Sequence, residues 1–148
     1  MVKRRISVRV LCAALAGIGG LGLCEMAVAF EPSVNYMLQC MGCHTPDGSG
    51  AAGRVPSIRP TLLPFSALAA GRQFLVQVPG ASQSTLSDAE LADLLNWMIE
   101  NLSNERRAVV FKRFTDAEVA SYRGRPLVEV GATRERLLNA TGIEETDK

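Results

Sequence analysis

Cys40-Met41-Gly42-Cys43-His44 is the most informative stretch of this sequence, because it contains three of the chain's five cysteine and histidine residues. The 148-residue chain has a single histidine, His44, and only two further cysteines, Cys12 and Cys24, both near the N-terminus. On a helical turn, residues three apart lie on the same side, and the imidazole of the next residue follows them. The stretch therefore combines two thiols and one imidazole on a single turn.

This C-x-x-C-H spacing is typical of covalent haem attachment. Each cysteine can form a thioether with one vinyl group of the haem, and the neutral imidazole can then bind the iron as its proximal ligand. The sequence predicts one haem c, held by Cys40 and Cys43 with His44 on the iron.

The first 29 residues have the layout of a secretory signal peptide. Basic residues within 3–9 precede an apolar run from Val10 to Cys24, and Ala27-Val28-Ala29 offers small residues for cleavage before Phe30. The apolar run is shorter than the ~20 residues of a spanning helix, which favours cleavage over a retained anchor. We expect cleavage after Ala29, a periplasmic protein and no stable membrane span after cleavage.

Removal of residues 1–29 leaves a mildly acidic chain. The full sequence has 16 Lys/Arg and 15 Asp/Glu, of which the first 29 residues contain four basic and one acidic. No cluster of Lys/Arg remains that could neutralise a row of phosphates, so nucleic acid is not an expected partner.

Other uses of the motif agree less well with this shorter chain. A structural zinc site needs four nitrogen or sulfur ligands, and only Cys40, Cys43 and His44 remain. A thioredoxin-like C-x-x-C belongs to a strand-rich α/β frame, and no alternating apolar run precedes Cys40. A plain disulfide between the two cysteines would give the adjacent histidine no role.

The residues around the motif predict a short helix before it and a long loop after it. Pro32 can open a helix that continues to Gln39 and leads into the motif. The stretch 45–50 is rich in turn residues, and four prolines follow by residue 79. We therefore expect a wrapping loop with one helical turn near Phe65–Arg72; a loop this long suits the enclosure of a prosthetic group.

Three helical signals follow. Ser87-Asp88-Ala89-Glu90 is a capping box ahead of apolar residues at helical spacing, with Asn104 as a plausible end. Thr115-Asp116-Ala117-Glu118 repeats the start signal, and a last amphipathic stretch runs from about Arg125 to Asn139. The sequence thus predicts an all-α protein.

The order of these parts resembles the class I cytochrome c family over roughly Pro32 to Leu102. The resemblance implies a haem-wrapping domain of three to four helices at residues 30–103, with 104–148 as a helical C-terminal extension. It also implies that the carbonyl of Pro56 bonds the ring nitrogen of His44 that faces away from the iron. Tyr36 and Trp97 match the aromatic positions where the family's first and last helices cross, and would pack at the haem pocket.

One departure from the family concerns the second axial ligand. The resemblance implies a methionine in the loop before the closing helix, but the loop Val78–Leu86 contains none. Gln83 stands about where the methionine sulfur would come from, and Met98 lies on the closing helix. Three outcomes compete: Gln83 near the iron, which we favour, Met98 bound after a local rearrangement, or a vacant site. An amide oxygen is a weak ligand, so a Gln83 site should have a lower potential than a Met-ligated one.

Two functions remain open at this point. The first is a periplasmic electron carrier with redox partner proteins, a periplasmic dehydrogenase being one candidate. The second is a haem protein with an open or weak sixth site that binds a small gas or peroxide, as sensor or enzyme. No catalytic constellation accompanies the motif, which favours the carrier over an enzyme. The extension at 104–148 could be a docking surface or a pair of helices that cover the haem domain.

Overall fold

The structure is a computed structural model that describes residues 29–104 and 110–144, so the predicted signal peptide lies almost wholly outside the described residues. The seven helices described are α1 (Pro32–Gln39), α2 (Leu62–Ala67), α3 (Ala69–Gln77), α4 (Pro79–Ser82), α5 (Asp88–Leu102), α6 (Asp116–Arg123) and α7 (Val130–Thr141). The only β pairing in these ranges is an isolated bridge between Ala51 and Val55. The fold is all-α, as predicted.

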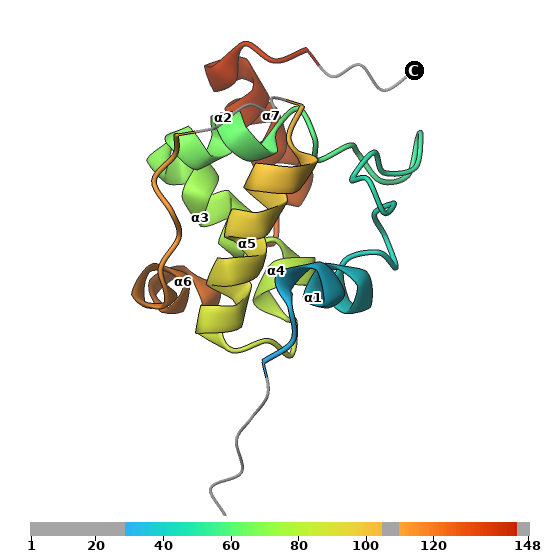
Figure 1. The fold of residues 1–148 in the computed structure, drawn as a ribbon. Coiled ribbons are helices and arrows are strands. Elements are labelled where there is room, and N and C mark those ends of the chain that lie inside the picture. The colour runs from blue at the N-terminus through green and yellow to red at the C-terminus, as the bar shows by residue number, and fades with distance from the viewer. Residues whose placement is uncertain (1–28, 105–109, 145–148) are drawn as a thin grey trace, which may run out of the picture.

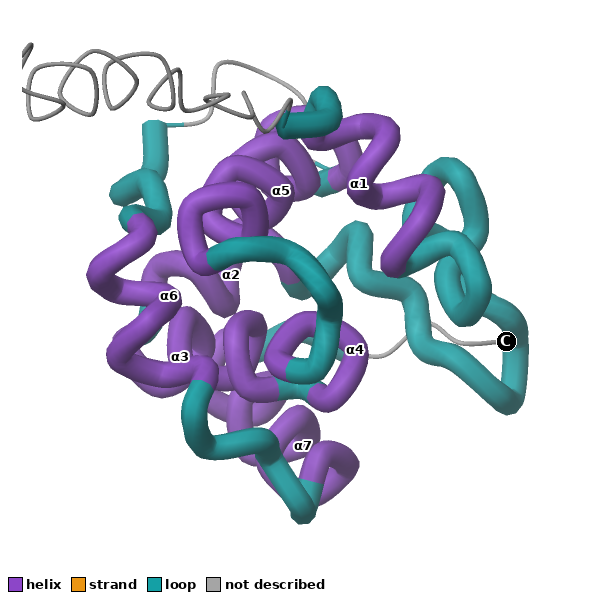
Figure 2. Tube along the Cα trace, turned by 90° about the horizontal axis from the view of Figure 1, so that it is seen from below, coloured by secondary structure: helices purple, strands orange, loops and turns teal. Residues whose placement is uncertain are grey.

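The helix α5 runs through the centre of the molecule, and the other helices are arranged around it (Figure 1). It contacts α1, α2 and α6, while α3 contacts α2, α4, α6 and α7. The long loop 44–61 forms one side of the molecule (Figure 2). Among the described helices, none has both the length and the apolar character needed to cross a membrane.

The starts of α1, α5 and α6 follow the predicted signals. Pro32 occupies the first turn of α1, where a missing N–H leaves no hydrogen bond unmade. Ser87 forms the complete capping box with Glu90 at the start of α5. At α6 only half of the box forms: Thr115 accepts from the backbone N–H of Glu118, but the Glu118 carboxylate is bound to Arg72 instead.

The region after the long loop is more helical than the sequence predicts. The expected single turn near Phe65–Arg72 is two helices, α2 and α3, separated at Leu68 by one extended residue. The prediction was wrong because it took the prolines as evidence for a loop. Pro64 lies in the first turn of α2, where its missing N–H costs nothing. The last helix also begins later than predicted, at Val130 rather than near Arg125.

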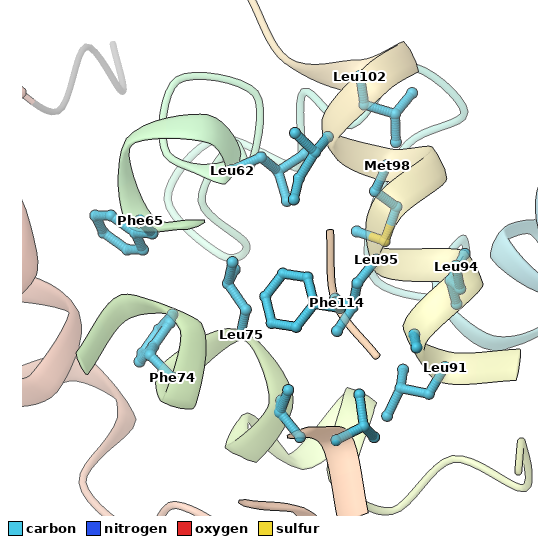
Figure 3. Close-up of a cluster of buried hydrophobic side chains, with 14 of the residues drawn as sticks. Leu62, Phe65, Phe74, Leu75, Leu91, Leu94, Leu95, Met98, Leu102 and Phe114 are labelled. Atoms are coloured by element: carbon cyan, nitrogen blue, oxygen red, sulfur yellow. The ribbon is translucent and has the colours of Figure 1, made fainter. Parts of the chain in front are cut away.

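The hydrophobic core combines both halves of the chain. Leu62, Leu75, Leu95 and Met98 surround a common interior with Phe114, which comes from the segment before α6 (Figure 3). Val119 of α6 and Leu137 and Leu138 of α7 are also buried in this core. Such packing supports the interpretation that the C-terminal extension covers the haem domain.

Candidate functional site

The predicted attachment motif forms one tight turn at the end of α1. The backbone N–H groups of Cys43 and His44 both donate to the carbonyl of Cys40, at 3.1 and 2.8 Å. Both cysteines are free thiols; Cys40 is half-buried and Cys43 is exposed. Burial, with the neighbouring Cys43 as a second cause, raises the pKa of Cys40 to about 11. The Cys40 thiol is therefore protonated at neutral pH.

The imidazole of His44 is half-buried, and its Nδ1 is buried without a hydrogen-bond partner. Burial lowers the pKa of His44 below its usual value, so the ring is neutral at pH 7. Neutral imidazole is the form that binds metals. Because buried polar atoms are nearly always satisfied, an unpartnered ring nitrogen at this position fits a residue that serves a cofactor.

The predicted hydrogen bond between His44 and Pro56 is not formed in this structure. The carbonyl of Pro56 approaches Gly50 instead: its oxygen lies 2.8 Å from where a Cβ on Gly50 would be. Gly50 has a φ of 75°, so glycine is required there for both its backbone conformation and this close approach. The proposed role of Pro56 beside His44 remains a prediction.

The turn after His44 is held by polar contacts that the sequence did not single out. Thr45 Oγ1 and the N–H of Ser49 donate to Asp47 Oδ1, at 2.8 and 3.2 Å, and Arg59 binds Asp47 Oδ2 at 2.9 Å. These bonds hold the pKa of Asp47 far below its usual range, and the bond from Thr45 has the largest effect. A T-x-D-x-S pattern is typical of such a turn and could have identified Asp47.

The two predicted aromatic residues meet at the crossing of α1 and α5. The ring centroids of Tyr36 and Trp97 are 5.6 Å apart with a tilt of 42°. The hydroxyl of Tyr36 also donates to the carbonyl of Thr45, at 2.7 Å. The pair therefore links the helix before the motif, the closing helix and the turn after the motif.

The two candidate sixth ligands have different surroundings. Met98 is buried on α5 beside Leu95 and Leu62 in the core (Figure 3). Gln83 is exposed at the C-terminal end of α4. The choice of sixth ligand stays a prediction.

A cleft of about 600 Å³ separates the long loop from the C-terminal extension. Gly53, Arg54, Val55 and Pro56 line one wall, and Gly131, Arg134, Glu135 and Leu138 of α7 line the other. Of the predicted site residues only Pro56 lines this cleft, so the cleft is not part of the attachment turn. The features that fit a covalently attached haem are the two free thiols and the neutral imidazole whose Nδ1 has no hydrogen-bond partner.

Two known proteins are similar to this chain over most of its length, although no protein-family model matches it. One cytochrome c-552 of Thermus thermophilus is 29% identical over 132 compared residues, and the match covers 76% of this chain and 89% of the relative. A second cytochrome c-552 of Thermus thermophilus is 29% identical over 119 compared residues, and the match covers 67% of this chain and 91% of the relative. The chain is thus a distant homologue, over most of its length, of cytochrome c-552, a class I c-type cytochrome.

Proposed function

We propose that this protein is an exported monohaem c-type cytochrome that carries electrons. The observation that carries the proposal is the turn at Cys40–His44, where two free thiols precede a half-buried imidazole whose Nδ1 has no hydrogen-bond partner. The homology to cytochrome c-552 supports the same function. Haem bound at this turn would supply one-electron chemistry.

The chain's own residues would attach and orient the haem. Cys40 and Cys43 would form the thioethers, and His44, neutral because of its burial, would bind the iron. Tyr36 and Trp97 would keep α1, which carries the turn, in a fixed position against α5. Electron transfer through an exposed haem edge needs no acid or base from the protein.

Periplasmic redox partners, with a dehydrogenase as one candidate, belong to this proposal. Export is supported by residues 1–29, whose sequence has the layout of a cleavable signal peptide. Near the end of α1 that leads into the attachment turn, Met37 and Leu38 are apolar residues that are more than half exposed, at 52 and 59%; Phe30, which precedes α1, is 60% exposed. Exposed apolar residues next to a haem edge would let a partner approach closely.

One observation favours the alternative function, which is the binding of a small gas or peroxide at an open sixth site. Met98 is a core residue that must leave its pocket to bind iron, and Gln83 is exposed and offers only a weak oxygen ligand. A labile sixth site would bind carbon monoxide readily in the reduced protein. We favour the carrier, because no catalytic constellation is found beside the turn in the described residues.

The covalent haem can be tested directly. The protein should be co-expressed with a periplasmic haem-attachment system, purified and extracted with acidic acetone. We expect the haem to stay with the protein, and expect Cys40→Ala and Cys43→Ala each to weaken retention because one thioether is lost. Ser33→Ala, at an exposed position in the first turn of α1, is a control that should retain haem fully. Extraction of the haem from the wild-type protein would contradict the proposal.

The ferric and ferrous spectra decide between the two functions. A ferric band near the red that marks sulfur ligation, lost in Met98→Ala and kept in Gln83→Ala, would assign Met98. A missing band with rapid binding of carbon monoxide would instead favour the gas-binding or peroxide alternative.

A further inference from the structure

The loop between α4 and α5, residues 83–87, borders the proposed haem site. The side chain of Gln39, which directly precedes Cys40, donates from Nε2 to Thr85 Oγ1 at 3.1 Å. This contact places the middle of the loop beside the attachment turn. Gln83, the predicted sixth ligand, is the first residue of the same loop.

The opposite side of this loop is held by one side chain of the C-terminal extension. Arg123, the last residue of α6, donates to the carbonyls of Ser82, Ser84 and Leu86, at 3.1, 2.5 and 2.5 Å. It also bonds the hydroxyl of Ser84 and the carboxylate of Asp88, both at 3.1 Å. One guanidinium therefore binds every second carbonyl from Ser82, at the end of α4, to Leu86 in the loop.

This arrangement depends on the guanidinium rather than on charge alone. Five N–H donors in a planar fork can reach several acceptors at fixed angles, whereas a lysine ammonium is a compact point charge on a flexible stem. The Arg123 side chain is only 16% exposed, so water cannot easily replace its contacts. Because the bonds go to backbone carbonyls, they fix the conformation of the loop itself.

We propose that Arg123 is a positioning residue that holds the loop 83–87 closed beside the haem site, so that α6 limits the access of external ligands to the iron. The inference rests on the proposed function, since it concerns the iron of an attached haem. It assigns to the C-terminal extension a role beyond covering the core: α6 sets the shape of the loop that carries Gln83.

The test uses the haem-loaded protein and the variant Arg123→Lys. Hydrogen exchange of the loop amides and the association rate of carbon monoxide with the reduced protein are measured. We expect both to rise by about tenfold, which corresponds to about 1.4 kcal/mol, the size of one hydrogen bond to a charged group. Lysine keeps the charge, so the change reports the lost fork geometry.

Two control variants separate loop positioning from other effects. Arg125→Lys makes the same exchange at an exposed arginine two residues further along, and should leave both measurements unchanged. Leu137→Ala removes a buried side chain from α7, an element that takes no part in the Arg123 contacts; it should lower the thermal midpoint without opening the loop. If Arg123→Lys does not fold, Asp88→Asn, which weakens one Arg123 contact, should give a smaller increase in both measurements.

The proposal is overturned if the variant's exchange and association rates stay within twofold of the wild type. It is also overturned if Leu137→Ala raises both rates as much as Arg123→Lys does. A failure of the proposed function is a separate result: without haem there is no carbon monoxide signal, and hydrogen exchange alone still shows whether Arg123 holds the loop.

Discussion

At the residue scale, the ion pair of Arg72 and Glu118 places two charges almost out of contact with water. Two guanidinium nitrogens of Arg72 donate to the two carboxylate oxygens, both at 2.6 Å, and the side chains are 6 and 14% exposed. Arg72 also donates to the carbonyls of Ser66, Lys112 and Arg113, and its guanidinium lies 3.8 Å over the ring of Phe114. A buried charge is tolerated because its donors are satisfied in this way.

The variant Glu118→Gln tests this pair. Hydrogen bonding to Arg72 lowers the pKa of Glu118 below its ordinary 4.5. The unfolded chain therefore binds a proton that the folded chain does not, and the free energy of unfolding falls as the pH drops through 4.5 towards the lowered pKa. We expect the variant to lose about 2 kcal/mol at pH 7, because the Arg72 guanidinium stays charged but faces an uncharged amide with a single acceptor oxygen. The acid limb should be flatter, because the titrating carboxylate is gone.

Denaturant unfolding between pH 3 and 8 measures both effects. Glu129→Gln, at an exposed glutamate whose side chain caps nothing, is the matched control and should reproduce the wild-type curve. If the curves of Glu118→Gln and the wild type are parallel over the whole range, the carboxylate does not carry the acid sensitivity that we assign to it.

No pattern in the sequence could have paired residues 72 and 118. Arg72 stands in a stretch where charged residues usually face solvent, and Glu118 was predicted to complete a capping box. The box competes with the ion pair for one carboxylate, and the ion pair prevails because its partner is buried. Local signals identify what a residue can do, whereas the contact that it makes depends on which helices meet.

At the scale of elements, α2 and α3 approach each other at Gly71. A Cβ on this residue would lie 2.2 Å from the carbonyl oxygen of Phe65 and 2.7 Å from its carbonyl carbon. These are backbone atoms, so they cannot move aside as a flexible side chain could. The close approach also brings Phe65 and Phe74 into an edge-to-face contact, with ring centroids 5.6 Å apart.

We therefore expect Gly71→Ala to destabilise the protein by about 3 kcal/mol, as overpacking against a rigid neighbour does. The control is Gly131→Ala in α7, where nothing lies within 4 Å of the new Cβ. Alanine favours a helix over glycine, so this variant should be stabilised by up to about 1 kcal/mol. Thermal unfolding of the two variants gives opposite shifts; a neutral Gly71→Ala would show that α2 and α3 can separate at little cost.

Helix starts were the elements most accessible to prediction. Pro32 and Ser87 act through contacts within one turn, so local sequence is sufficient to place α1 and α5. The helices α2 and α3 depend on packing against α5, α6 and α7, and the number of prolines in the sequence does not reveal such packing. The turn at Cys40–His44 is likewise formed by local hydrogen bonds, while the surroundings of Gln83 and Met98 depend on the tertiary fold.

At the scale of the whole molecule, residues 110–144 are joined to α3 and α5 by paired hydrogen bonds as well as by apolar contacts. The amide of Asn96, buried on α5, accepts from the N–H of Phe114 and donates to its carbonyl, at 2.8 and 3.0 Å. Gln77 makes a second link: its side chain donates to the carbonyl of Tyr122, and its own carbonyl accepts from the N–H of Leu127. Residues 110–144 are therefore part of one cooperative structure.

Truncation after Asn104 should accordingly abolish stable folding. The shortened chain loses Phe114, Val119 and Leu138 from the core and exposes the apolar surface that they cover. Truncation after Glu129, which removes α7 alone, should cost less, because the contacts of α6 remain. Thermal unfolding and electron-transfer rates with a chemical oxidant measure the integrity of both shortened chains. Unchanged stability after truncation at Asn104 would favour a docking role for the extension instead.

The participation of α7 in the core also affects when the core can form. Leu137 and Leu138 are buried in the same core as Tyr36, which lies far earlier in the chain. Contacts at such a separation form late, and a chain is synthesised from its N-terminus. The two thiols beside His44 are thus made early, while the helix that completes the core is made last. The interval between these two events is a period in which an attachment enzyme can reach both thiols before Cys40 becomes half-buried in the complete fold, where Cys43 stays exposed.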